Sequence, residues 1–190
     1  MQTIKLGSGV TNGNSTSGVN KKRKKKHILT LGGDILKIDW KKLLICVAIP
    51  LAVGGLAALI TMGAMEGFSA LEQPPLSPPG WLFPVVWTIL YTLMGIASYL
   101  VYTSGKPGRA KTALTVYGVQ LFFNFLWSIV FFNLGWYLFA FLWIIALWLL
   151  VIFTTVLFYR INRVAGYLMI PYILWVTFAA YLNLGIYLLN

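Results

Sequence analysis

Charged residues are scarce in this sequence of 190 residues, and acidic ones are the scarcest. Lys and Arg number 15, Asp and Glu number 4, and all four types together make up 10% of the chain. Soluble domains contain about a quarter charged residues. Hydrophobic residues make up 59% of this chain, so too few polar side chains exist to cover a water-exposed globule. A lipid bilayer must therefore surround most of the protein.

Cysteine and histidine are nearly missing, which excludes several kinds of site. Cys46 is the single cysteine, so the chain cannot form an internal disulfide. His27 is the single histidine, and no cluster of Cys, His or carboxylate side chains accompanies it. We therefore expect no metal site, no cofactor, and no Ser–His or Cys–His catalytic set.

The first forty residues differ in composition from the rest. Residues 7–20 are rich in Gly, Ser, Thr and Asn, and Lys21 to Lys26 is an unbroken basic run. Such a composition buries little, so residues 1–40 are expected to form a disordered basic cytoplasmic tail. The tail is expected to adhere to anionic lipid. The pI near 9.9 does not indicate nucleic acid, because long apolar segments separate the basic clusters.

Residues 41–190 contain five apolar stretches without a charged residue. A helix needs about 20 residues to cross a bilayer, and each stretch is long enough. The expected spans are 43–65, 81–102, 112–132, 136–159 and 164–189. The sequence therefore predicts an all-α integral membrane protein, a single domain formed by a bundle of five transmembrane helices.

The basic residues alternate between the connections. Residues 5–42, 103–111 and 160–163 carry every Lys and Arg, whereas the 66–80 loop and the 133–135 turn carry none. Because positive loops remain in the cytoplasm, this pattern predicts an inner N-terminus and an outer C-terminus.

The 66–80 loop is the longest expected outer connection. Five of its last seven residues are Pro or Gly, including Pro78 and Pro79, so a stiff extended segment is expected there. The loop would serve either as a plain connector or as a lid over the helix ends.

Polar and aromatic residues recur on single faces of three spans. These faces comprise Pro84, Trp87, Tyr91 and Gly95; Gln120, Asn124, Trp127 and Phe131; and Pro171, Trp175, Phe178 and Leu182, with Asn183 beside the last. An amide in hydrocarbon must find a partner, so the three faces are expected to meet. The amides would form hydrogen bonds between helices or line a pocket, and Trp87 and Trp175 are expected to line one.

The fourth span has no polar residue before Thr154. We expect it to be the most lipid-exposed helix, with Trp143 facing lipid.

Several motifs follow one another in a characteristic order. The third span contains Gln120-Leu121, Asn124, Trp127-Ser128 and Phe131-Phe132. The last span contains Pro171-Tyr172, Trp175, Phe178-Ala179, Leu182-Asn183 and Ile186. The first loop and second span contribute Leu71, Pro74, Pro78-Pro79, Phe83, Trp87, Tyr91, Gly95, Ala97 and Tyr99. Over roughly residues 43–190, this order and spacing resemble the signatures of the TspO/MBR family.

The resemblance implies a membrane receptor that binds porphyrins such as protoporphyrin IX, and also isoquinoline carboxamide and benzodiazepine drugs. It implies a homodimer in a membrane, expected here to be the bacterial plasma membrane. Ligand would lie between the second and fifth spans beneath the 66–80 loop. The residues expected to bind it are Pro78, Pro79, Trp87, Tyr91, Asn124, Trp127, Pro171, Trp175, Phe178 and Asn183.

Two alternative functions follow from the same resemblance. Some bacterial members promote light-dependent breakdown of porphyrin, which would give Trp87 and Trp175 a catalytic role. The other alternative is passive transport of tetrapyrrole or sterol-like ligands, since the spans contain no ionisable residue for proton coupling.

Overall fold

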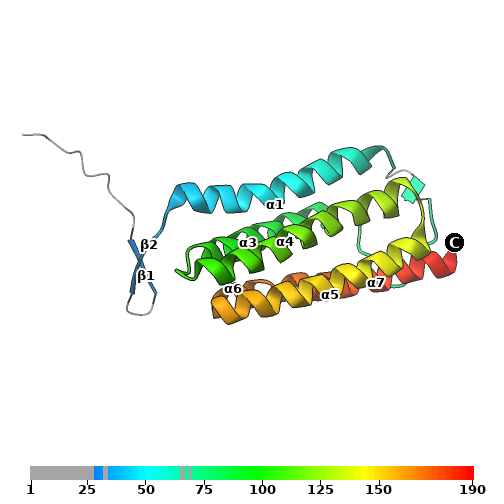
Figure 1. Ribbon diagram of the computed structural model, residues 1–190. Coiled ribbons are helices and arrows are strands. Elements are labelled where there is room, and N and C mark those ends of the chain that lie inside the picture. Colours follow the sequence, from blue (N-terminus) through cyan, green and yellow to red (C-terminus); the bar gives the residue numbers. More distant parts are fainter. Residues whose placement is uncertain (1–27, 32–33, 65–66, 69) are drawn as a thin grey trace, which may run out of the picture. The chain divides into compact units, whose positions relative to one another are not determined.

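The computed structural model describes residues 28–31, 34–64, 67–68 and 70–190 (Figure 1). It divides the chain into two units at the boundary between Ile38 and Asp39.

The first unit contains a two-stranded antiparallel sheet. Strands β1 (Ile28–Leu31) and β2 (Asp34–Lys37) pair with Ile28 opposite Lys37. The β-branched residues of these segments favour strands, and the Gly32-Gly33 pair that separates them in the sequence is typical of hairpin connections. Both strands lie within the stretch, residues 1–40, that was expected to form the disordered tail. The basic run at 21–26 lies outside the described residues.

The second unit is a helical bundle. Within the described residues, five helical segments are long and apolar enough to span a membrane. They are α1 (Trp40–Thr61) with the short 3₁₀ turn η1 (Met62–Ala64), α3 (Leu82–Tyr102), α4 (Pro107–Ser128) with the π-helical turn η2 (Ile129–Asn133), α5 (Tyr137–Ile161), and α6 (Arg163–Leu168) followed by α7 (Ile170–Leu189). The predicted all-α membrane bundle is confirmed, and its long helices run side by side (Figure 1).

The last span is interrupted once. Met169 separates α6 from α7, and Pro171 lies in the first turn of α7. Proline has no backbone N–H to donate to the preceding turn, so a new helix begins at this point. Asn162 begins α6 in the same way that polar residues begin soluble helices, because its Oδ1 accepts the backbone N–H of Ala165 at 3.1 Å.

Helices α1 and α3 approach closely through glycine. A Cβ on Gly95 would lie 2.5 Å from the Cα of Val47, and a Cβ on Gly54 would overlap the ring of Tyr91. Small residues allow such contact between helix backbones in membranes.

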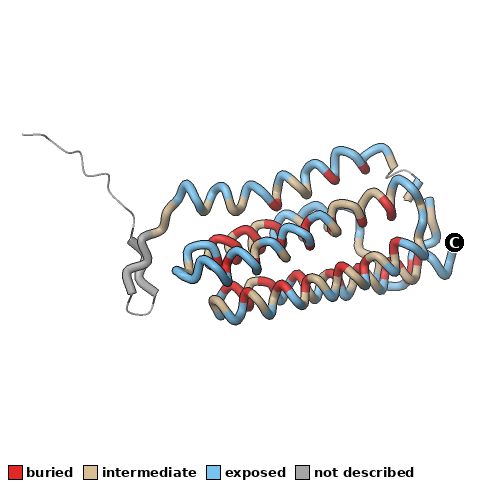
Figure 2. Tube along the Cα trace, viewed as in Figure 1, coloured by how far each residue is buried: buried red, intermediate tan, exposed pale blue. Residues whose placement is uncertain are grey.

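Helix α1 is the most exposed span, which corrects the expectation for the fourth span. Its buried residues are Pro50, Ala57 and Thr61, whereas α5 has six. Figure 2 shows buried residues along the inward sides of the other long helices and few along α1. The fourth span lacks polar residues, yet its small and apolar side chains pack against both α4 and α7. Apolar composition alone does not distinguish a lipid-facing helix from a buried one.

Candidate functional site

A network of neutral polar side chains joins α3, α4 and α7. Tyr91 donates its hydroxyl to Oδ1 of Asn124 at 2.6 Å. The hydroxyl oxygen of Tyr172 accepts N–H groups from Nε2 of Gln120 at 2.6 Å and from Nδ2 of Asn124 at 3.0 Å. Gln120, Asn124 and Tyr172 are at most 1% exposed, so water cannot reach their polar groups. The hydrogen bonds between the helices pair these groups instead.

Aromatic side chains extend this network toward the loop. Trp87 stacks on Tyr91 with ring centroids 5.3 Å apart and meets Tyr172 edge-on at 6.1 Å. One turn earlier in α3, Phe83 meets Trp175 of α7 edge-on at 6.0 Å. The large rings of α3 therefore touch those of α7 at successive levels.

The backbones of α3 and α7 are not closely packed. In the described chain, the closely packed pairs include α1 with α3, α4 with α5, α5 with α7 and α3 with α6, but not α3 with α7. The two helices meet through the large rings of Phe83, Trp87, Tyr172 and Trp175 instead. Such a seam can admit a flat molecule by moving side chains, without separating two tightly packed backbones.

Trp175 carries an unsatisfied polar group within this seam. Its Nε1 is buried from solvent and has no hydrogen-bond partner among the described residues. Buried indole N–H groups usually find an acceptor, so this one is free to donate to a bound molecule. The ring itself is half-buried, between Phe83 and Phe178.

A second aromatic cluster lies where α4, α5 and α7 meet. Nε1 of Trp127 donates to Oδ1 of Asn183 at 3.4 Å, and Nδ2 of Asn183 donates to the backbone oxygen of Tyr137 at 3.1 Å. Trp127 stacks on Phe131 at 5.2 Å, and the loop residue Phe68 meets Phe131 at 5.7 Å. These contacts bury Asn183 to 1% exposure, so its amide holds helices together.

The loop that precedes α3 is fastened to α7 at three points. The side-chain amide of Asn190 accepts the backbone N–H of Glu72 at 3.0 Å and donates to the backbone oxygen of the same residue at 3.1 Å. Tyr181 donates its hydroxyl to the oxygen of Pro75 at 2.8 Å. Pro74 is buried against Gly185, where a Cβ would lie 2.5 Å from the proline ring. These contacts hold the loop against the C-terminal half of α7.

The structure brings most of the expected binding residues together, but not all of them. Trp87, Tyr91 and Asn124 form one connected group with the seam that contains Trp175 and Phe178. Trp127 and Asn183 belong to the second cluster. Pro171 is exposed in the first turn of α7, at the end of that helix opposite the loop contacts. Pro78 is half-buried and Pro79 is exposed, just before α3 begins.

Trp143 does not face lipid as expected. Its Nε1 donates to the backbone oxygen of Phe123 at 2.9 Å, and its ring stacks on that of Phe123 at 4.7 Å. The reason is the indole N–H, which needs an acceptor in hydrocarbon and finds one on the neighbouring helix.

Tyr172 is the central residue that sequence reasoning did not include among the binding residues. It is fully buried and accepts both amides of α4. A usable signal existed in the sequence, because Gln120 and Asn124 lie one turn apart and require a partner on another span.

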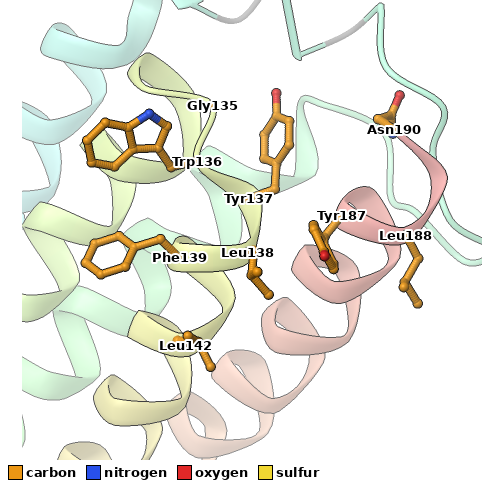
Figure 3. A pocket seen from close by; sticks show the side chains of 9 residues that line it. All are labelled: Gly135, Trp136, Tyr137, Leu138, Phe139, Leu142, Tyr187, Leu188 and Asn190. Atoms are coloured by element: carbon orange, nitrogen blue, oxygen red, sulfur yellow. The ribbon is translucent and has the colours of Figure 1, made fainter.

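A large groove opens elsewhere on the bundle. It has a volume of about 840 Å³ and lies between the start of α5 and the end of α7, as Figure 3 shows. None of the expected binding residues lines it; its lining comprises Gly135, Trp136, Tyr137, Leu138, Phe139, Leu142, Tyr187, Leu188 and Asn190. Trp136 is 59% exposed and Leu188 is 70% exposed, so the groove is open to its surroundings. Such an open groove suits contact with lipid better than enclosure of a ligand.

Charge gathers at the opposite end of the bundle from the loop. Lys41, Lys42, Lys106, Arg109, Lys111, Arg160 and Arg163 are all exposed. Lys106 donates from Nζ to the backbone oxygen of Ile161 at 3.1 Å, where a cation suits the end of α5. Asp39 begins α1, and a hydrogen bond from the backbone N–H of Lys42 lowers the pKa of its carboxyl. Within the described residues, Lys42 and Asp39 form the one ion pair, at 3.5 Å.

Comparisons with known proteins agree with this architecture. Residues 46–189 match the model of the TspO/MBR family. The chain is 37% identical over 150 residues to the tryptophan-rich protein TspO of Chlorobaculum tepidum, covering 78% of this chain and 95% of that protein. It is 39% identical to the tryptophan-rich protein TspO of Archaeoglobus fulgidus, covering 78% and 97%, and 33% identical to the translocator protein of Homo sapiens, covering 63% and 72%. With five apolar helices and a family match over most of its length, this chain is an integral membrane protein that belongs to the TspO/MBR family.

Proposed function

We propose that the protein is a membrane receptor that binds porphyrins and related flat apolar ligands between α3 and α7, beneath the loop that ends at Gly80. The observation that supports this most strongly is Trp175. Its ring lies in a seam joined by aromatic side chains, and its buried N–H has no partner among the described residues. A porphyrin offers large π-faces to these rings and carboxylate oxygens to that donor.

Fluorescence quenching tests this proposal. Protoporphyrin IX is added in darkness to the reconstituted full chain, and affinity is measured for Trp175→Ala, Trp87→Ala and Trp136→Ala. Truncating a buried aromatic anchor costs about 2 kcal/mol or more, so the first two variants should bind at least about tenfold more weakly. Trp175→Phe should retain much of the affinity, because the ring survives.

Trp136→Ala is the matched control, because it removes an exposed tryptophan from the groove at the start of α5. Its affinity should equal that of the parent. If Trp136→Ala lost binding and Trp175→Ala did not, the ligand would sit in the groove and the proposed site would be wrong.

Light-driven breakdown of bound porphyrin is the second candidate function. Trp87 touches two oxidisable rings, Tyr91 and Tyr172, which favours electron transfer from the site to an excited ligand. Illumination in the presence of dioxygen should then bleach the porphyrin at a rate that Trp175→Phe abolishes while binding persists. Bleaching at equal rates with and without the protein would leave binding as the function.

Passive transport is the remaining alternative. Within the described residues, every buried polar side chain is neutral, which suits an uncoupled carrier and gives proton coupling no group to use. Efflux of preloaded porphyrin from proteoliposomes, unaffected by a proton gradient, would support transport over binding alone.

The orientation and location are also proposals. We place the basic end and the N-terminus in the cytoplasm of a bacterial cell, because Lys and Arg gather at one end of the bundle. In a Cys46→Ala background, Leu76→Cys and Gly108→Cys should react with an impermeant thiol reagent from opposite sides of intact cells. Reaction from the same side would contradict the five-span topology.

A homodimer and a lipid-bound tail complete the proposal. Helix α1 presents exposed large and small apolar residues to its surroundings, which a second copy could cover. The mass of the protein in nanodiscs distinguishes one copy from two.

The basic run at 21–26 should bind vesicles containing anionic lipid at low salt and release them at high salt.

A further inference from the structure

A second groove opens at the basic end of the bundle, away from the seam between α3 and α7. It has a volume of about 460 Å³ and lies among the end of α5, α6 and the start of α7. Its walls are mainly apolar, and its lining comprises Thr155, Val156, Tyr159, Arg160, Gly166, Tyr167 and Ile170.

The groove owes its shape to a close helix crossing. Gly166 is buried, and a Cβ there would lie 2.5 Å from the Cβ of Tyr159. The missing side chain lets α6 approach α5, and the rings of Tyr159 and Tyr167 then meet edge-on at 5.6 Å. Both tyrosines are exposed, at 42% and 57%.

The groove is amphipathic along the direction of the helices. Val156 lies about one turn before Arg160 in α5, and Ile170 lies two turns inside the last span, which begins at Arg163, so both lie on the membrane side of Arg160. Arg160 is exposed in the last turn of α5, and within the described residues it has no ion-pair partner. The carbonyl at the end of that helix is already taken, because Ile161 accepts a hydrogen bond from Lys106.

We propose that this groove is a binding site for an anionic phospholipid. An acyl chain lies against Val156 and Ile170, and the phosphate accepts hydrogen bonds from the guanidinium of Arg160. A guanidinium suits a phosphate because it donates two parallel N–H groups, and its apolar stem packs on the chain below. The hydroxyls of Tyr159 and Tyr167 lie at the depth where such aromatic residues contact headgroups.

The neutral groove at the other end of the bundle provides an internal comparison. It also lies between two helix ends and is also lined by tyrosine and apolar residues, but it contains no charged side chain. This groove can accept an acyl chain, but it has no cationic side chain that could bind an anionic headgroup. A preference for anionic lipid should therefore appear at the basic groove alone.

Photocrosslinking in liposomes tests the proposal on the full chain. Phosphatidylglycerol or phosphatidylcholine with a diazirine near the headgroup end of one acyl chain is activated, and crosslinked peptides are mapped by mass spectrometry. The readout is the yield in segment 155–170 divided by the yield in segment 136–142 of the same sample. One cation near an anionic lipid favours binding about fivefold, so the ratio for phosphatidylglycerol should exceed that for phosphatidylcholine by about this factor.

Two variants locate the preference. Arg160→Gln should reduce the phosphatidylglycerol ratio about fivefold, to the phosphatidylcholine value. Arg109→Gln removes the same charge from an exposed position at the same end of the bundle, in the first turn of α4, and should leave the ratio unchanged. The thermal unfolding temperature of both variants confirms that the bundle is intact.

Three outcomes would overturn the proposal. Equal ratios for the two lipids would mean that the groove has no preference for anionic lipid. Equal losses in Arg160→Gln and Arg109→Gln would assign any preference to the general charge of this surface. Loss of the phosphatidylglycerol preference when inorganic phosphate is added before photoactivation would identify a site for free anions in place of lipid.

Discussion

The seam between α1 and α3 is formed at glycines, where the two helices approach closely, whereas the seam among α3, α4 and α7 is formed by hydrogen-bonded tyrosines and amides. In the first, Gly95 lets the backbone of Val47 approach. In the second, the hydroxyl of Tyr172 accepts two buried amides. Within lipid the hydrophobic effect does not drive apolar helix surfaces together, so helices associate through close packing and polar contacts.

The difference explains where a ligand would enter. A seam of glycines brings backbones together and leaves no space between them. Tyrosines and tryptophans keep backbones apart, and the rings of Trp87 and Trp175 occupy the separation between α3 and α7. A site for a flat molecule is therefore expected at the polar and aromatic seam, and α1 is expected to contribute stability alone.

The largest expected effect is at the glycine seam. Gly95→Val would place a side chain against the backbone of α1, at 2.5 Å from the Cα of Val47. Overpacking of this kind costs about 1–3 kcal/mol, and the upper end is expected because backbone cannot move aside as a flexible side chain can. Unfolding by SDS in mixed micelles measures the change. Gly118→Val is the control, since nothing lies within 4 Å of its Cβ position, and its cost should be much smaller.

This experiment could also reverse the comparison. If Gly95→Val left stability unchanged but weakened porphyrin binding, α1 would belong to the binding region and the division between the seams would be wrong.

The next largest effect is at the polar seam. Tyr172→Phe leaves two buried amide N–H groups without an acceptor. Hydrogen bonds between membrane helices contribute about 0.6 kcal/mol on average and up to about 1.7, so the loss of two should cost about 1–2 kcal/mol. The same unfolding assay measures it. Tyr187→Phe, at an exposed position on the same helix, should cost almost nothing.

A double-mutant cycle tests whether the hydrogen bond between Asn124 and Tyr172 contributes to stability. Combining Tyr172→Phe with Asn124→Leu should cost less than the sum of the two single changes, by roughly 0.5 kcal/mol or more. Strict additivity would mean that the observed hydrogen bond carries no energy.

The two seams also differ in how far the sequence predicted them. Five spans and the meeting of three polar faces followed from composition and helical period, because a long apolar stretch has few alternatives in a bilayer. The faces were predicted from Gln120 and Asn124, which require partners. Tyr172 was missed as their partner, because a tyrosine in an apolar span is equally suited to the membrane interface.

The remaining errors share a physical cause. Trp143 and the exposure of α1 depend on which neighbour each helix meets, and this is not a property of the helix alone. Gly54 approaches Tyr91, whereas Gly55 beside it has nothing near its Cβ position. Both glycines look alike in the sequence, so the packing face of α1 could not be assigned from spacing alone.

A smaller effect is expected where the loop is fastened to α7. Tyr181→Phe removes the donor to the backbone oxygen of Pro75 and should cost about 0.5–1.5 kcal/mol of loop closure. Hydrogen exchange of residues 70–77 should quicken accordingly, and ligand dissociation should quicken with it. Tyr187→Phe serves again as the control, and its loop should exchange at the parent rate. Faster exchange without faster ligand dissociation would show that the loop is a connector and not a lid.

The smallest effect is expected at the start of α1, where a carboxylate caps the first turn of the helix. Asp39 begins the helix, and its carboxyl accepts the backbone N–H of Lys42 at 3.4 Å, which lowers the pKa of that carboxyl. A carboxyl whose pKa is lower when folded stabilises the fold above its unfolded pKa, near 3.9, and this contribution is lost as pH falls through the folded value. The protection factor of the Lys42 amide, which corrects for the intrinsic pH dependence of exchange, should therefore fall on acidification below about pH 4. Because the side chain is solvent-screened, the first turn of α1 should fray while the helix itself remains in place. Asp39→Ala should show low protection at every pH, and Asp39→Asn should show intermediate protection without the acid step. An acid step that persisted in Asp39→Asn would assign the titration to another group, and α1 would then depend on packing alone.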